Sequence, residues 1–119
     1  MGKNVKDVYA LMGEDYDEVI GRLKKDERIE KFLIKFLETK EYNQVVEALK
    51  NDDIKAAFES AHTIKGLSLN LGFSKLGSAC ALFCDNIRDN VVKAPIAPLM
   101  DSFSKEYENV CSAIKILCD

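Results

Sequence analysis

The chain has 119 residues, with 17 basic and 20 acidic side chains and a formal net charge of −3. That length suits one domain, and a hydrophobic content of 47% is enough to build a core, which excludes a disordered chain. The mild acidity gives no electrostatic footprint for nucleic acid or for an anionic membrane, so we expect neither as a partner.

The first 26 residues are predicted to form a helical extension. Apolar residues spaced by three and four predict short helices over 5–11 and 15–23. Residues 1–12 lack the continuous apolar stretch of a signal peptide, and nowhere do about 18 apolar residues follow one another, as a spanning helix requires. We therefore expect a cytoplasmic protein with reduced cysteines.

Residues 27–119 are predicted to form the main domain. An amphipathic stripe predicts a helix near 27–38, and the same pattern resumes over 42–49 after a bend at Thr39. The next expected helix covers 53–71, with Asp52 as its N-cap and Gly72 at its end. A further helix is expected over 75–89 with Ser74 as its cap, and the last helix has Pro98 in its first turn. Short connections indicate antiparallel neighbours. The predicted fold is all-α: an antiparallel (up-down) four-helix bundle with additional short N-terminal helices.

The only histidine, His62, is predicted to lie on the outer face of the helix over 53–71. At about 100° per residue it points roughly 200° away from Ile64. The small and apolar residues that fall on the opposite, inner side are Ala57, Ala61, Ile64, Ser68 and Leu71. An exposed imidazole is nucleophilic near neutral pH and can accept a phosphoryl group.

Four neighbours on this outer face fit such chemistry. Lys65, three residues after the histidine, places an ammonium within reach of a phosphoryl group. Gly66 costs the helix about 1 kcal/mol relative to alanine, and its missing side chain opens a path for a bulky partner. Phe58 and Leu69 flank the histidine with apolar surface that suits partner docking.

The stretch AHTIKG at 61–66, followed by NLGF at 70–73, resembles the signature of histidine-containing phosphotransfer (HPt) domains. The resemblance covers roughly residues 28–90. It implies a four-helix bundle in which His62 is phosphorylated, on Nε2, by an aspartyl phosphate of one receiver domain and passes the group to another. By the same resemblance, Lys65 steadies the phosphoryl oxygens and Gly66 admits the receiver.

The resemblance also implies the partners and the cofactor needs. The partners would be response-regulator receiver domains and a (hybrid) sensor histidine kinase. The protein itself would be a monomer. The chain would have no ATP-dependent kinase activity and no cofactor or metal of its own, because the Mg²⁺ belongs to the receiver domain.

Two positions depart from the family pattern. Relatives often have a small or hydroxylated residue after the glycine, where this chain has Leu67. They also often have a glutamine or glutamate 22 residues past the histidine, where this chain has Cys84, a poor hydrogen-bonding substitute. Water, Arg88 or Gln44 are therefore the candidates for orienting the imidazole.

Three alternatives stay open at this point. A chemotaxis-type histidine kinase carries a similar phosphotransfer domain, although the initiating Met1 favours a free-standing module. A non-catalytic helical-bundle binding module would leave His62 incidental. A zinc site would need thiolates from two helices, and its four candidate ligands are Cys80, Cys84, Cys111 and Cys118. Such cysteines are far more often small buried core residues.

Overall fold

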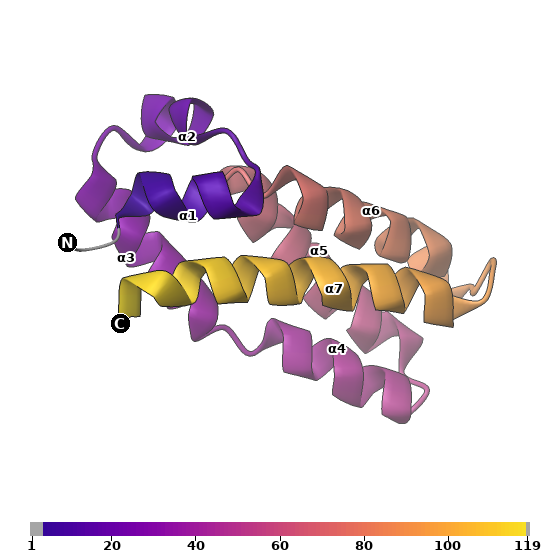
Figure 1. The fold of residues 1–119 in the computed structure, drawn as a ribbon. Coiled ribbons are helices and arrows are strands. Elements are labelled where there is room, and N and C mark those ends of the chain that lie inside the picture. The colour runs from indigo at the N-terminus through magenta and orange to yellow at the C-terminus, as the bar shows by residue number, and fades with distance from the viewer. Residues whose placement is uncertain (1–3, 119) are drawn as a thin grey trace.

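The computed structural model describes residues 4–118, and within that range every regular element is a helix. Figure 1 shows the elements. The α-helices are α1 (Val5–Met12), α2 (Tyr16–Leu23), α3 (Asp26–Leu37), α4 (Glu41–Lys50), α5 (Ile54–Asn70), α6 (Ser74–Ile87) and α7 (Ile96–Ile114). Two 3₁₀ turns, η1 (Arg88–Asn90) and η2 (Lys115–Cys118), follow α6 and α7. No helix in the described part of the chain is long and apolar enough to span a membrane.

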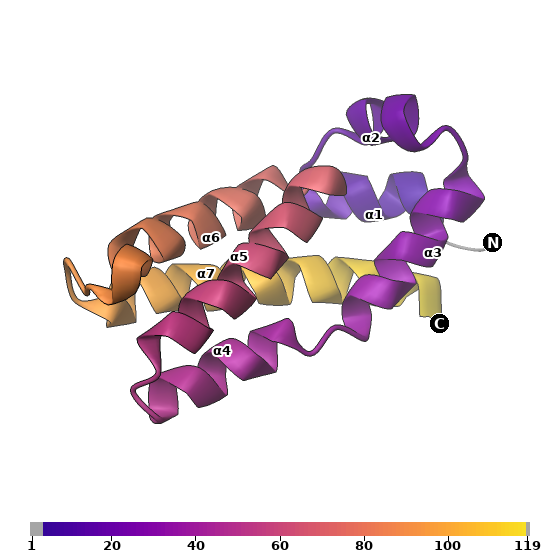
Figure 2. The same cartoon turned by 180° about the vertical axis from the view of Figure 1, so that it is seen from behind.

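Helices α4, α5, α6 and α7 form the predicted four-helix bundle. Figure 2 shows α5 lying between α4 and α6, while α7 closes the bundle behind it. From α4 to α7 the chain reverses direction at each connection, so neighbouring helices of the bundle are antiparallel. The all-α class and the helical bundle predicted from the sequence are thus confirmed.

An aromatic cluster joins α7 to the helices across the bundle. The rings of Tyr42 in α4 and Tyr107 in α7 stack with centroids 4.2 Å apart, and Phe36 of α3 lies 5.7 Å from Tyr107. Phe103 is fully buried in α7, and its ring centroid lies 5.5 Å from those of both Tyr42 and Phe83 of α6. These edge-on and stacked pairs fix how α3 and α4 lie on α7.

The turn between α5 and α6 follows the predicted glycine stop. Gly72 has a φ of +77°, in the left-handed region, and the Phe73 amide donates to the Ser68 carbonyl at 2.7 Å. This is a Schellman motif, which satisfies carbonyls at the end of α5. At the start of α5 the prediction was one residue off, because Asp53 and not Asp52 accepts the Ala56 amide. Asp52 instead adopts a left-handed φ of 55° in the preceding turn.

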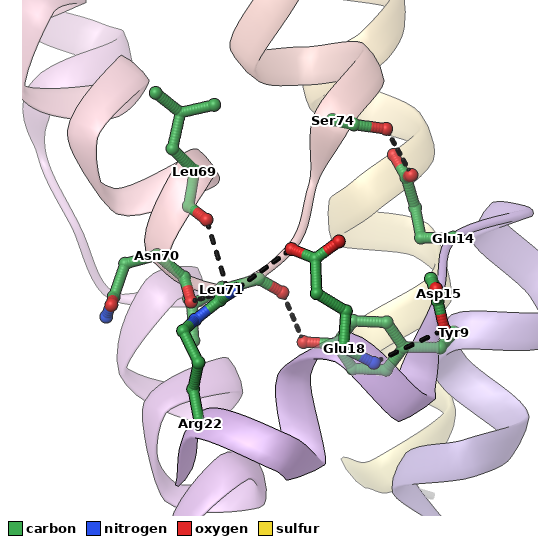
Figure 3. A network of polar contacts seen from close by, with 9 residues as sticks. All are labelled: Tyr9, Glu14, Asp15, Glu18, Arg22, Leu69, Asn70, Leu71 and Ser74. Carbon is green, nitrogen blue, oxygen red and sulfur yellow. Dashed lines mark hydrogen bonds and ion pairs between the residues drawn. The ribbon is translucent and has the colours of Figure 1, made fainter.

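The cap of α6 comes from the N-terminal extension, so the prediction that Ser74 caps this helix was wrong. Phe73 occupies the N-cap position and makes no side-chain cap. The carboxylate of Glu14, between α1 and α2, accepts hydrogen bonds from the Ser74 hydroxyl and, at 3.0 Å, from the Lys75 amide. Figure 3 shows Glu14 reaching Ser74. A carboxylate at this end also complements the helix dipole.

The same extension caps the C-terminal end of α5. The Arg22 guanidinium of α2 donates to the carbonyls of Asn70 at 2.7 Å and Leu69 at 3.3 Å, and the Tyr9 hydroxyl of α1 donates to the Leu71 carbonyl (Figure 3). A cation at a helix C-terminus is favourable because unpaired carbonyls point there. Helices α1 and α2 therefore clasp the α5–α6 turn from outside the bundle.

We expect Glu14→Ala to lower the free energy of unfolding by about 1 kcal/mol, because the substitution removes the carboxylate that caps α6. Urea unfolding followed by circular dichroism measures the change. Glu30→Ala, at an exposed position of α3, is the matched control and should change stability by less than about 0.5 kcal/mol. Equal losses in the two variants would contradict the capping role.

Candidate functional site

Helix α5 presents His62 to solvent because its opposite side is tightly packed. Four inward residues have no exposed surface: Ala57, Ala61, Ile64 and Ser68. The buried Ser68 hydroxyl has a hydrogen-bond partner, because it donates to the Ile64 carbonyl at 2.7 Å. Small side chains here let α4 and α6 approach α5 closely. His62 lies on the other face and is exposed, as the helical spacing predicts.

Gly66, one turn after His62, borders open space. A Cβ built on Gly66 meets no atom within 4 Å, so internal packing does not require a glycine at this position. Gly77 of α6 shows the contrast, since its Cβ would lie 2.9 Å from the Leu69 side chain. The helix thus carries the propensity cost of Gly66 without any packing gain within the chain. The role of Gly66 in admitting a partner stays a prediction.

Lys65 carries a positive charge on α5 that acts on neighbouring residues of α6. Burial raises the pKa of the Cys80 thiol to about 12 and that of Cys84 to about 11, and the Lys65 charge acts on both in the opposite sense. The pKa of Asp85 is lowered first by its hydrogen bond from Arg88 and also by Lys65. The half-buried lysine therefore lies near enough to α6 for its charge to act on Cys80, Cys84 and Asp85.

Aromatic contacts bring Phe58 and Arg88 to the histidine. The rings of Phe58 and His62 stack with centroids 5.7 Å apart and planes inclined by 28°. The Arg88 guanidinium carbon lies 5.2 Å from the Phe58 centroid, and Arg88 also pairs with Asp85 at 2.9 Å. Arg88 thus lies against the residue that stacks on His62, and its own contacts are with the Phe58 ring and Asp85. Its predicted role in orienting the imidazole stays a prediction.

Gln44 and Leu69 are the remaining predicted orienting and docking residues. Gln44 of α4 accepts a hydrogen bond from the Ser60 hydroxyl at 3.2 Å, which directs it to a neighbouring side of α5. Leu69 is 52% exposed and continues the outer face toward α2. The proposed docking roles of Phe58 and Leu69 stay predictions.

The cysteines are spread over the bundle. Cys80 and Cys84 are buried in α6, Cys111 is half-buried in α7, and Cys118 is exposed in η2. Across residues 4–118, no three His, Cys, Asp or Glu side chains gather in a cluster that would bind a metal ion. Cys84 occupies the position discussed above for imidazole orientation; as a buried, protonated thiol it offers only a weak donor and acceptor.

The sequence reasoning missed two features that surround this site. The clasp of Arg22 and Glu14 on the ends of α5 and α6 joins residues about 47 to 61 positions apart. The contact between Arg88 and Phe58 joins two different elements. A charged residue in a short helix carries no sequence signal of such distant contacts, so only the relative placement of the helices identifies them.

Comparison with known proteins supports the interpretation of this site. A family model described as the Hpt domain matches residues 33–113, which is more than half of the chain. The match includes α5 with His62, Lys65 and Gly66, and extends into α7. Neither the curated proteins nor the solved structures gave a match.

We expect Gly66→Ala to raise the free energy of unfolding by about 1 kcal/mol, because alanine is the better helix former and its Cβ meets no neighbour. Denaturant unfolding measures the change. Gly21→Ala in α2 is the matched control, since its Cβ is equally free of neighbours, and it should also stabilise. Destabilisation by Gly66→Ala would show that the glycine serves packing within the chain.

Proposed function

The chain belongs to the Hpt domain family, and from that membership we propose that it is a phosphorelay intermediate whose His62 accepts a phosphoryl group from a receiver-domain aspartate and passes it to a second receiver domain. Hpt domains carry out histidine phosphotransfer in phosphorelays. The observation that carries the assignment to this chain is an exposed His62 beside a glycine that borders open space.

The transfer needs only one nucleophile from this chain. The lone pair of Nε2 attacks the phosphorus of the aspartyl phosphate, the N–P bond forms, and the P–O bond to the aspartate breaks. The receiver recovers its carboxylate, and Nδ1 keeps its proton, so the phosphorylated ring is cationic until water takes that proton. Passing the group to the second receiver reverses these steps. Such a reaction depends on positioning and charge stabilisation.

Three features of α5 serve this reaction in the proposal. Lys65 places an ammonium one turn from His62, where it stabilises the phosphoryl oxygens. Gly66 leaves room for the receiver to bring its aspartate in line with Nε2. Phe58 and Leu69 supply apolar surface on either side of the histidine. The chain needs no resident cofactor in this scheme, since the Mg²⁺ is bound by the receiver domain.

The proposal extends to partners and setting. Hpt domains interact with receiver domains and with histidine kinases, and we propose a hybrid sensor kinase as the source of the phosphoryl group and a response regulator as its destination. We further propose that the protein acts as a cytoplasmic monomer without ATP-dependent kinase activity. Under this proposal ATP alone leaves the chain unlabelled.

We expect His62→Gln to abolish phosphorylation of the chain by a phosphorylated receiver, because glutamine has no nucleophilic nitrogen. The label is followed on acid-free gels, since phosphohistidine is acid-labile and base-stable. Thr63→Gln is the matched control, because it introduces the same side chain at the next, also exposed position of α5 and should keep transfer. Labelling of the His62→Gln protein would refute the assignment of the acceptor.

We expect Gly66→Ala to slow transfer by about tenfold, because a methyl group forced into a close interface costs about 1–3 kcal/mol. Gly21→Ala, which gives the same added Cβ far from His62, should transfer at the unmutated rate. Single-turnover transfer from a phosphorylated receiver measures both. Unchanged transfer in Gly66→Ala would mean that no partner approaches this part of α5.

A further inference from the structure

Within residues 4–118, the His62 side chain makes an aromatic contact. The Phe58 ring, one turn earlier on α5, stacks on the imidazole at 5.7 Å with an inclination of 28°. Over residues 4–118, none of the hydrogen bonds found involves the His62 ring. An exposed imidazole without such a contact samples several rotamers about its two side-chain torsions. The stack therefore restricts the orientation of Nε2.

Phe58 is itself held in place by Arg88. The guanidinium carbon lies 5.2 Å from the Phe58 centroid, a distance typical of a cation–π contact. The Arg88 guanidinium also donates to the Asp85 carboxylate at 2.9 Å, which favours this placement of the side chain. The chain also turns sharply directly after it, with left-handed φ values of 61° at Asp89 and 62° at Asn90. Arg88 thus stands where α6 ends and the chain turns.

The polar side chains near His62 that could orient the imidazole are engaged elsewhere or buried. Gln44 accepts its hydrogen bond from Ser60. Cys84 is buried and, with its pKa raised to about 11 by burial, stays a neutral thiol. Arg88 contacts the Phe58 ring and Asp85. Among the side chains around His62, Phe58 is therefore the one whose contact bears on the plane of the imidazole ring.

We propose that Phe58 is a positioning residue for phosphoryl transfer, which holds the His62 imidazole in the attacking orientation, and that Arg88 acts through Phe58. This inference rests on the proposed function and adds to it. It differs from a docking role, because a docking residue changes how tightly the receiver binds. A positioning residue changes the rate within the bound complex, where the fraction of correctly oriented rings sets the rate.

Phe58→Leu separates the two roles, because leucine keeps an apolar side chain for docking and favours the helix but has no ring to stack. Single-turnover transfer is measured over a series of phosphorylated-receiver concentrations. We expect about a fivefold fall in the plateau rate and an unchanged half-saturating concentration. Phe58→Tyr keeps the ring and should restore the plateau. The control Leu11→Ala removes an exposed leucine from α1, outside the proposed docking surface, and its plateau should not fall.

The role of Arg88 is tested by a double-mutant cycle. Arg88→Gln should lower the plateau about twofold in the unmutated background and have no further effect together with Phe58→Leu, because the two residues act in series. Equal effects in both backgrounds would show that Arg88 acts on the phosphoryl group directly. That result would overturn the second half of the proposal.

A readout on the free protein keeps the inference separate from the transfer reaction. The NMR order parameter of the His62 ring Cδ2–H bond should fall in Phe58→Leu and stay unchanged in Phe58→Tyr. An unchanged order parameter, or a change confined to the half-saturating concentration, overturns the positioning role alone. Absence of transfer to the unmutated chain overturns the proposed function and with it any positioning role in transfer.

Discussion

The close packing of the inner face of α5 is the constraint on which the site depends. The residues on this face are small or compact and have no exposed surface: Ala57, Ala61, Ile64 and Ser68. Because α4 and α6 both press against them, α5 has only one rotation about its axis that buries this stripe. That rotation puts His62 into solvent and aligns Lys65 and Gly66 beside it. The chemistry of the histidine therefore follows from packing on the opposite face of the same helix.

The N-terminal extension supports this arrangement at one end. Arg22 and Tyr9 satisfy carbonyls at the C-terminus of α5, and Glu14 satisfies donors at the start of α6 (Figure 3). Without these partners the helix ends would rely on water and on the glycine turn alone. At the other end of α6, the ion pair of Asp85 with Arg88 holds the guanidinium over Phe58. The start of α6 thus supports the turn that follows α5, and the end of α6 places Arg88 against the Phe58 ring beside the histidine.

Local patterns in the sequence were enough to predict the helices, the outward position of His62 and the stop at Gly72, since each depends on spacing or on the conformation of a single residue. Contacts between helices were not predictable in this way. The cap from Glu14, the pairing of Gln44 with Ser60 and the contact of Arg88 with the Phe58 ring all depend on how far one helix is shifted along another. Helical periodicity carries no information about that shift.

The central claim is that His62 accepts a phosphoryl group on Nε2. Phosphorus NMR of the chain after incubation with a phosphorylated receiver domain tests this most directly, because the only imidazole in the protein gives one assignable signal. The account predicts a single phosphohistidine resonance whose phosphorus couples to both carbon-bound protons of the His62 ring, as substitution at Nε2 requires. Coupling to Hε1 alone, or a phosphorus signal that belongs to another residue, would contradict it.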